Sequence, residues 1–354
     1  MHADQVGLRG RLGGDPALRA MAGLCAAVLV FAALREASSV FVPATFALFI
    51  IAVFWPVQRL LESRLPKLLA LLVTIVIVLV SVVGLAMLVA WGFSRVGQWT
   101  IVNASRFQDI YLRQTEWLEG HGIPVAGLFA EHFDMRWVVW LAQSLTGRMQ
   151  GLLSFLTVTL VFTMLGMLEV EVIRRKLVRM GRNGEGTRLL RACEQIGSKL
   201  QTYMLVRTVM SAVTGLSIWA FALAVGLELP VEWGMIAFAL NYIPFLGPLT
   251  ATVFPTLFAG LQFGSWEAAL TVFLCLNVIQ FVSGSYIEPR LAGKAVSVSP
   301  FLVLFAVFFW SFLWGIAGAF IGIPVTIALL VVCAQYDSTR WVAALLSGRD
   351  DAAA

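Results

Sequence analysis

The sequence predicts an all-α, polytopic membrane protein with about eight transmembrane segments, and those in the C-terminal half are expected to be broken or re-entrant. Of the 354 residues, 60% are hydrophobic and only 13% are charged, whereas soluble domains carry roughly 25% charged residues. The mean hydropathy is +0.87. Apolar runs of this length are too long for the core of a soluble domain, so the bilayer must be the main solvent for the fold.

Eight apolar segments emerge when the chain is divided at its charged side chains. A helix needs about 20 apolar residues to cross the hydrocarbon layer. The first segment is the shortest, and the arginines at its ends can reach the headgroups and let it span, so we expect it to be a retained helix. The segments lie between Arg19 and Arg35, Glu36 and Arg59, Lys67 and Arg95, Arg148 and Glu169, Arg207 and Glu228, Glu232 and Glu267, Glu267 and Glu288, and Lys294 and Asp337.

The basic residues predict the orientation of these segments. Residues 171–203 contain eight Lys or Arg side chains against three Glu, and such connections stay in the cytoplasm. This excess equals the net charge of the whole chain, +5, so the basic balance indicates an inner-face loop near lipid headgroups and no nucleic-acid partner. The N-terminus is then cytoplasmic, and residues 95–148 face outward, where Trp137 and Trp140 suit amphipathic helices on the membrane surface.

These features predict seven successive regions in the chain. They are a cytoplasmic tail (1–17), scaffold helices (18–94), extracytoplasmic amphipathic helices (95–148), a fourth transmembrane helix (149–170), a basic cytoplasmic connection (171–203), a transport unit with discontinuous helices (204–336) and a C-terminal tail (337–354).

No catalytic or metal-binding pattern is recognisable in the sequence. The four cysteines lie far apart, the three histidines are too few for a multi-histidine site, and a Ser/His dyad or an HExxH-like arrangement is missing. We therefore expect no enzyme activity, no cofactor and no bound metal.

Two of the apolar segments are too long for one crossing. Residues 233–266 and 295–336 would form helices of about 50 and 60 Å at 1.5 Å per residue, so both must break, tilt strongly or fold back. The first contains Asn241, Pro244, Gly247 and Pro248, and the second contains Gly315, Gly318, Gly322 and Pro324.

Broken helices leave backbone amides and carbonyls unpaired, which is tolerable only inside protein or beside a watery cavity. The sequence therefore predicts a substrate site around Asn241, Pro244, Gly247 and Pro248, where half-helix N-termini would face a ligand. For Gly318 and Gly322, which are spaced as GxxxG, the favoured alternative is close helix packing.

A polar stripe follows on the seventh segment. Asn277, Gln280, Gly284 and Glu288 share one face of an α-helix, and their side chains should meet protein, water or solute, because an unpaired amide is costly in hydrocarbon. Hydrogen bonds between helices would explain Asn277 and Gln280 equally well. Pro289 is expected to end the helix behind Glu288, with Arg290 as the partner of Glu288 in either a coupling site or a static pair.

Several blocks in the C-terminal half are similar to one transporter family. They are Asn241–Pro248 (NYIPFLGP), Gln280–Arg290 ending in IEPR, Gly293, Ser299–Pro300, and Phe309–Gly315 (FWSFLWG) followed by Gly318 and Pro324. In their order and spacing, these blocks make the chain resemble the autoinducer-2 exporter family of bacterial transporters. The resemblance is strong from about residue 200 to 335 and extends more loosely from residue 18.

The resemblance implies a multi-pass transporter of the bacterial inner membrane. Some members are linked to export of autoinducer-2, a quorum-sensing signal, and others to sodium or proton antiport. The resemblance also implies a homo-oligomer, such as a pentamer, in which a C-terminal transport unit moves in an elevator-like way against a scaffold of earlier helices. Ser311 departs mildly from the family, which commonly has a smaller residue there.

Three functional hypotheses follow. In the first, the protein exports a small polar solute; Asn241, Asn277 and Gln280 bind it, Gly247 and Gly293 allow close backbone approach, and Glu288 with Arg290 gates or couples transport. In the second, the protein is a Na⁺(Li⁺)/H⁺ antiporter that uses Glu288 or Glu267. In the third, it is a membrane scaffold or receptor that transports nothing.

Overall fold

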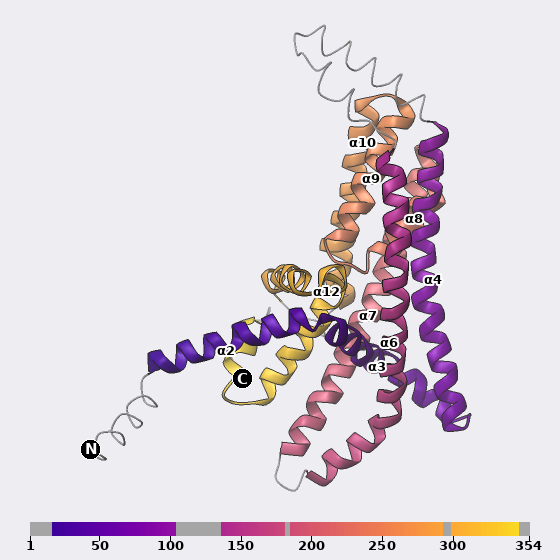
Figure 1. Ribbon diagram of the computed structural model, residues 1–354. Coiled ribbons are helices and arrows are strands. Elements are labelled where there is room, and N and C mark those ends of the chain that lie inside the picture. Colours follow the sequence, from indigo (N-terminus) through magenta and orange to yellow (C-terminus); the bar gives the residue numbers. More distant parts are fainter. Residues whose placement is uncertain (1–15, 104–135, 181–184, 293–298, 347–354) are drawn as a thin grey trace, which may run out of the picture.

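The computed structural model describes residues 16–103, 136–180, 185–292 and 299–346, and within these ranges the chain is helical without any strand (Figure 1). Seven of the described helices are long and apolar enough to cross a membrane. The all-α, polytopic fold class is therefore confirmed.

The described residues form twelve successive helical elements. Their bounds are α2 Pro16–Glu36, α3 Ser38–Glu62, α4 Lys67–Val102, α6 Arg136–Met180, α7 Glu185–Ala224, α8 Pro230–Leu240, α9 Leu246–Phe263, α10 Trp266–Phe281, the π-helix η2 Val282–Ile287, α11 Glu288–Ala292, α12 Pro300–Gln335 and α13 Arg340–Leu346.

Among the described residues, seven candidate crossings correspond to seven of the eight expected segments, and the expected first segment, in α2, is not one of them. The helix leaves the bundle at an angle in Figure 1. It contacts α12 through the rings of Phe31 and Phe309, 5.1 Å apart, and through Arg35, whose guanidinium lies 4.8 Å from the centre of the Phe312 ring.

The first helices of the bundle are joined by buried polar contacts. The Thr74 hydroxyl of α4 donates to Oε1 of Gln58 on α3 at 2.6 Å, and both side chains are buried. On the other side of α3, Nε2 of Gln201 on α7 donates to the carbonyl of Ala52 at 2.8 Å. The helices α6 and α7 form a long hairpin that carries the basic connection beyond the rest of the bundle (Figure 1).

The first overlong segment folds back on itself between α8 and α9. Phe245 caps α9 with φ 63° and ψ −47°, which takes the chain out of the helical path. The rings of Trp233 and Phe258 then meet, with 5.2 Å between their centroids. At the open end, the Gln262 side chain accepts from the amide of Glu228 and donates to the carbonyl of Gly226. The predicted break is therefore the tip of a helical hairpin.

The second overlong segment is also a hairpin, and its turn lies at Gly315. This residue has φ 63° and ψ −143°, so α12 consists of two helical arms. A Cβ at Gly318 would overlap the carbonyl of Trp310, and one at Gly322 would lie 3.1 Å from the carbonyl of Ala306. The indole of Trp310 reaches the Thr326 hydroxyl of the opposite arm at 3.3 Å. At the GxxxG pair, the two arms therefore pack closely against each other within one hairpin.

The helix that begins with α10 does not end at Pro289, contrary to expectation. It passes through the π-helix η2 into α11, so that residues Trp266–Leu291 form one continuous rod. A proline inside an α-helix clashes with the carbonyl four residues earlier. The wider π turn immediately before Pro289 moves that carbonyl away, which lets the helix continue.

The two hairpins meet beside α7. Ile243, at the tip between α8 and α9, packs against a buried cluster that contains Tyr203 of α7 and Val307 and Ala319 from both arms of α12. A second cluster joins the outer half of α7 to α8, α9 and α10, with Trp233 and Leu276 among its buried members. The surface between the hairpins and α7 is where the candidate site lies.

We predict that Gly318→Ala disrupts the α12 hairpin, whereas Gly84→Ala in α4 does not. The new methyl group of the first variant meets the Trp310 backbone, and overpacking of this kind costs about 1–3 kcal/mol. Within the described chain, nothing lies within 4 Å of a Cβ at Gly84, and Gly to Ala in a helix is worth up to about 1 kcal/mol in stability. Thermal unfolding in detergent measures both variants; equal melting temperatures would contradict the hairpin.

Candidate functional site

A stripe of buried polar side chains runs along α7. Tyr203, Arg207 and Ser211 are spaced by four residues, so they lie on one face of the helix. Their exposed fractions are 8%, 8% and 0%. Such burial is unusual for an arginine, which is almost never fully buried unless it is paired.

The partner of Arg207 is Glu288. Its Nη1 donates to both carboxylate oxygens of Glu288, at 3.0 and 3.2 Å. The guanidinium of Arg290, the expected partner, instead lies 4.1 Å from the centre of the Tyr286 ring. The expected pairing was wrong because the π-helix extends the rod along α7 and brings Glu288 to the buried face of that helix, while Arg290 stays exposed.

The hairpin tip joins the same face of α7. Asn241 is buried, and its amide donates to the Ser211 hydroxyl at 3.3 Å. The Tyr242 hydroxyl donates to the Thr208 hydroxyl at 3.1 Å. The structure thus brings Asn241 and Glu288 to one stripe, one turn of α7 apart.

Gln280 lies farther along the rod that carries Glu288, beyond the level of Ser211. Arg207 contacts Glu288, and Leu276 packs in the cluster that contains Ile218, so α7 and α10 run antiparallel. This register places Gln280 beside the part of α7 that follows Ser211. Its Nε2 atom is buried and has no hydrogen-bond partner among the described residues.

Several donors in this region lack partners in the described chain. Besides Gln280 Nε2, they are the Tyr203 hydroxyl and Nε of Arg207. The hydroxyl of Thr256 on α9 is also buried without a hydrogen-bond partner among the described residues. Buried polar groups in folded proteins almost always have partners, so a cluster without them calls for a bound molecule or water. The stripe on α7 and the residues facing it therefore form the candidate site.

The backbone of the first hairpin tip is paired, which differs from the expectation of bare main-chain amides. The amides of Ile243, Leu246 and Gly247 donate to carbonyls within the turn at 2.8–2.9 Å. A Cβ at Gly247 would overlap the carbonyl of Leu240, so this glycine permits the tight turn and its space is already occupied by protein. Pro244 is buried in the same turn, and Pro248 lies in the first turn of α9.

Other predicted residues lie away from the stripe. Asn277 and Gly284 are exposed on the chain, and the Asn277 amide donates to the carbonyl of Phe273 in its own helix. The π-helix adds residues to one turn and so rotates Glu288 away from the face that an α-helix would give it. Gly293 lies outside the described residues. Within the described residues, acidic, cysteine and histidine side chains form no group suited to a metal ion.

Sequence reasoning missed Tyr203, Arg207 and Ser211. Dividing the chain at charged residues made Arg207 the boundary of a segment, although α7 extends without interruption on both sides of it. The four-residue spacing of Tyr203, Arg207 and Ser211 was the available signal.

A second missed feature joins α4 to the first hairpin. Glu232 of α8 is buried and accepts from Nε of Arg95 at 3.3 Å, and the indole of Trp99 donates to Glu228. A Cβ at Gly92 would lie 2.7 Å from Ile236. The outer half of α4 is therefore attached closely to α8.

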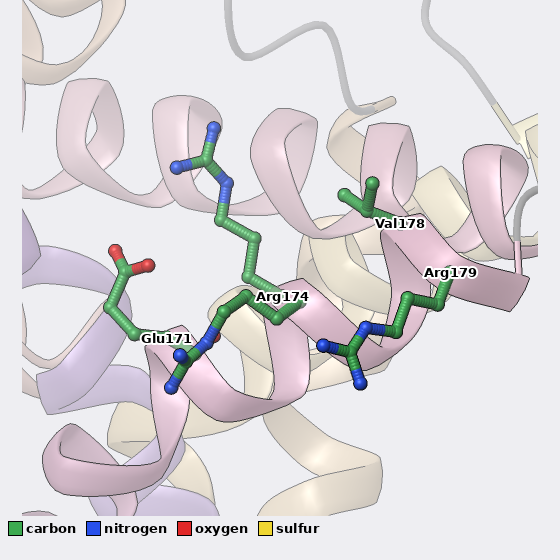
Figure 2. Close-up of a pocket in the computed structure, with 5 residues that line it drawn as sticks. Glu171, Arg174, Val178 and Arg179 are labelled. Carbon is green, nitrogen blue, oxygen red and sulfur yellow. The ribbon is translucent and has the colours of Figure 1, made fainter.

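A cavity of about 320 Å³ lies elsewhere, on the extension of α6 (Figure 2). Its lining residues all come from three turns of this one helix; they are Glu171, Arg174, Arg175, Val178 and Arg179. An open groove along a single helix beside the basic connection suits headgroups and solvent better than a cargo site.

Comparison with known proteins agrees with this architecture. The profile of the AI-2E family transporter matches residues 24–338. The chain belongs to the AI-2E transporter family. Because the match covers both hairpins and α7, the candidate site lies within the part shared by the family.

Relatives in the family cover nearly the whole chain. AI-2 transport protein TqsA of Escherichia coli strain K12 is 28% identical over 90% of this chain and 93% of its own. A Haemophilus influenzae protein provisionally described as a transport protein is 23% identical over 94% of this chain and 97% of its own. A Borreliella burgdorferi protein with the same description is 30% identical over 54% of this chain and 52% of its own. This AI-2E chain is accordingly a multi-pass membrane protein with a transporter role.

We predict that Arg207→Met destabilises the protein by about 2–3 kcal/mol. Removing one partner of a buried pair costs roughly 3–5 kcal/mol, and the Glu288 side chain is 32% exposed, which reduces the penalty. The double variant Arg207→Met/Glu288→Gln should lose less than the two single variants together, because it leaves no unpaired charge.

Arg290→Met is the matched comparison for this pair. It removes only an exposed cation–π contact, worth about 0.5–1 kcal/mol. Unfolding titrations in detergent measure all four variants. A larger loss with Arg290→Met than with Arg207→Met would contradict the pairing of Arg207 with Glu288.

Proposed function

We propose that this AI-2E chain is a secondary transporter that exports a small polar solute by alternating access. The transport unit consists of α7 and the two hairpins, α8–α9 and α12, with the rod from α10 to α11 between them. It moves in an elevator-like way against α3 and α6.

The observation that carries this proposal is a set of buried, unpartnered donors on α7 and on the rod that packs against it. Tyr203, Arg207 and Gln280 each contribute a buried atom without a partner among the described residues. Discontinuous helices that meet near the middle of a bundle are the usual setting for cargo sites in secondary transporters. A small solute with several oxygen atoms would satisfy these donors.

The class of cargo follows from the donors and from the relatives. Polar side chains of this kind select oxygen-rich solutes by hydrogen bonds. The name of TqsA refers to AI-2, which makes an AI-2-like signal a reasonable member of the panel to be tested, beside other polar metabolites.

Sodium/proton exchange is the second candidate, and the geometry favours it less. Glu288 already holds the guanidinium of Arg207, so a sodium ion would have to enter beside a positive charge. Glu267 is exposed in the first turn of α10 and accepts from the Ser265 hydroxyl at 3.0 Å, which is an ordinary position for an acid at a helix N-terminus.

The setting of the transporter is part of the proposal. We place the protein in the bacterial inner membrane, with lipid around it and with the N-terminus in the cytoplasm. Nε2 of Gln335 donates to Gln195 at 3.0 Å, which supports a C-terminus on the same side as the basic connection. The exposed apolar helix α2 is consistent with a homo-oligomer, such as a pentamer.

A crosslink between α3 and α7 tests the movement. Gln201 donates to the carbonyl of Ala52, so cysteines at positions 52 and 201, introduced in a background without the four native cysteines, can be bridged by a short bis-maleimide. We expect the bridge to reduce flux of the active solute in proteoliposomes more than 10-fold, because it ties the moving unit to the scaffold.

The matched control is a bridge within one unit. Cysteines at positions 228 and 262 join the open end of the α8–α9 hairpin, where the amide of Glu228 already donates to Gln262, and this bridge should leave flux within about twofold. Equal flux with and without the bridge at 52 and 201 would rule out movement between α7 and α3.

Gln280→Ala should weaken binding of the transported solute about 5- to 30-fold and leave assembly unchanged, since one buried hydrogen bond is worth roughly 1–2 kcal/mol. Isothermal titration gives the affinity, and size-exclusion chromatography gives the assembly state. If the variant no longer folds, Gln280 is a structural contact between helices.

A further inference from the structure

We propose that the cargo of this transporter carries a carboxylate, that Arg207 binds this group in place of Glu288, and that Glu288 takes up one proton when it is displaced. The inference rests on the proposed transport function and specifies its substrate class and coupling ion.

The geometry of Arg207 provides the first argument. Both oxygens of Glu288 are held by a single nitrogen, Nη1, at 3.0 and 3.2 Å. Nε on another edge of the guanidinium is buried without a partner in the described chain. Guanidinium groups bind carboxylates best through two parallel N–H donors. The pair with Glu288 therefore leaves part of the hydrogen-bonding capacity of Arg207 unused.

Tyr203 supplies a second donor for the same ligand. It precedes Arg207 by one helical turn on the same face of α7, and its buried hydroxyl lies beside the Arg207 side chain without a well-aligned hydrogen bond among the described residues. An acceptor seated between the hydroxyl and Nε would satisfy both groups. The donors on this face call for an oxyanion more than for a cation, because a guanidinium can only donate.

The difference in exposure identifies Glu288 as the group that moves. The side chain of Arg207 is 9% exposed, whereas that of Glu288 is 32% exposed. Glu288 begins the short helix α11, immediately after the π-helix η2, and π turns inside α-helices are frequent at functional positions. An incoming carboxylate can therefore replace Glu288 without uncovering the arginine.

Charge balance then requires a proton. In the empty state, the charges of Arg207 and Glu288 cancel. If a carboxylate binds Arg207 while Glu288 stays ionised, two negative charges share one positive charge in a poorly solvated place, which is strongly unfavourable. Protonation of Glu288 restores neutrality, so one proton travels with each carboxylate, and the loaded site is again uncharged.

The neighbouring side chains in the described chain do not supply another acid in contact with Arg207 that could take up the proton in place of Glu288. The charged or titratable side chains nearest to the pair along the elements packed against it are Lys199 and Tyr203 on α7, Tyr242 at the hairpin tip, Tyr286 and Arg290 on η2 and α11, and Arg59 and Glu62 at the end of α3. Farther along the same elements lie Glu185, Arg188, Arg191, Cys193 and Glu194 on α7, Glu232 on α8, and Glu267 and Cys275 on α10. The helix α12 has no charged side chain from Pro300 to Gln335. Glu288 is therefore the acid in direct contact with Arg207.

The test measures binding and proton uptake together on the purified full-length protein in detergent. The probes are acetate, lactate and benzoate, three monocarboxylates of increasing size, with ribose as a neutral control. We expect at least one monocarboxylate to bind with uptake of about one proton per bound anion, followed with an indicator dye in weak buffer, and to bind about tenfold more weakly for each pH unit of increase at high pH.

Variants separate the assigned roles. Glu288→Gln resembles the protonated acid, so it should bind the same anion without proton uptake and with an affinity that no longer depends on pH. Tyr203→Phe should weaken binding 3- to 10-fold, and Arg207→Met should weaken it more than 10-fold. Arg64→Met, at an exposed position between α3 and α4, should behave as the wild type.

The outcomes distinguish this inference from the proposed function. If ribose or AI-2 binds and none of the three monocarboxylates does, or if an anion binds without proton uptake, the carboxylate inference is overturned and solute transport stands. Loss of anion binding in folded Glu288→Gln would also overturn the inference. If the bridge between positions 52 and 201 leaves all flux unchanged, the proposed mechanism fails whatever the cargo.

Discussion

The pairing of polar groups where helices are interrupted is the constraint on which this structure depends. Hydrocarbon offers no hydrogen bonds, so every amide and carbonyl released by a broken helix must find a partner inside the protein. At the first hairpin tip, the amides of Ile243, Leu246 and Gly247 bond within the turn itself. At the second, the two arms of α12 lie so close that Gly318 and Gly322 cannot carry larger side chains. The first break is thereby stabilised by hydrogen bonds within its turn, and the second by close packing of its two arms.

The consequence is that polar side chains, and not the broken backbone, supply the unmet hydrogen-bonding capacity. Tyr203, Arg207 and Gln280 hold donors that the described chain does not use, and they lie on α7 and on the rod that packs against it. Burying such groups without partners is costly, so their presence is best explained by a molecule that is bound for part of the transport cycle. The Arg207–Glu288 pair adds a charged contact that can open, since one of its partners is one-third exposed.

The contacts also bear on which helices move together. The outer half of α4 is joined to α8 by Gly92, by the Arg95–Glu232 pair and by Trp99, although α4 belongs to the early part of the chain. Its inner half is joined to α3 through Thr74 and Gln58. In the proposed elevator movement, a helix attached at one end to each unit suits an arm that bends or pivots, and the boundary of the proposed transport unit would then cross α4.

Local chemistry determined much of this protein from its sequence. Long uncharged runs specified the helices, two runs of excessive length specified the breaks, and Pro244, Gly247 and Gly315 marked the tips, because these effects act over a few neighbouring residues. Asn241 and Glu288 were also recognisable as site residues. Only the tertiary structure decided that Glu288 pairs with Arg207 and not with Arg290, because a π turn before Pro289 rotates the rod by an amount that an α-helical pattern does not encode. The burial of Tyr203 and Arg207 was likewise decided by tertiary structure, since it arises from hairpins that are distant in sequence and close in space.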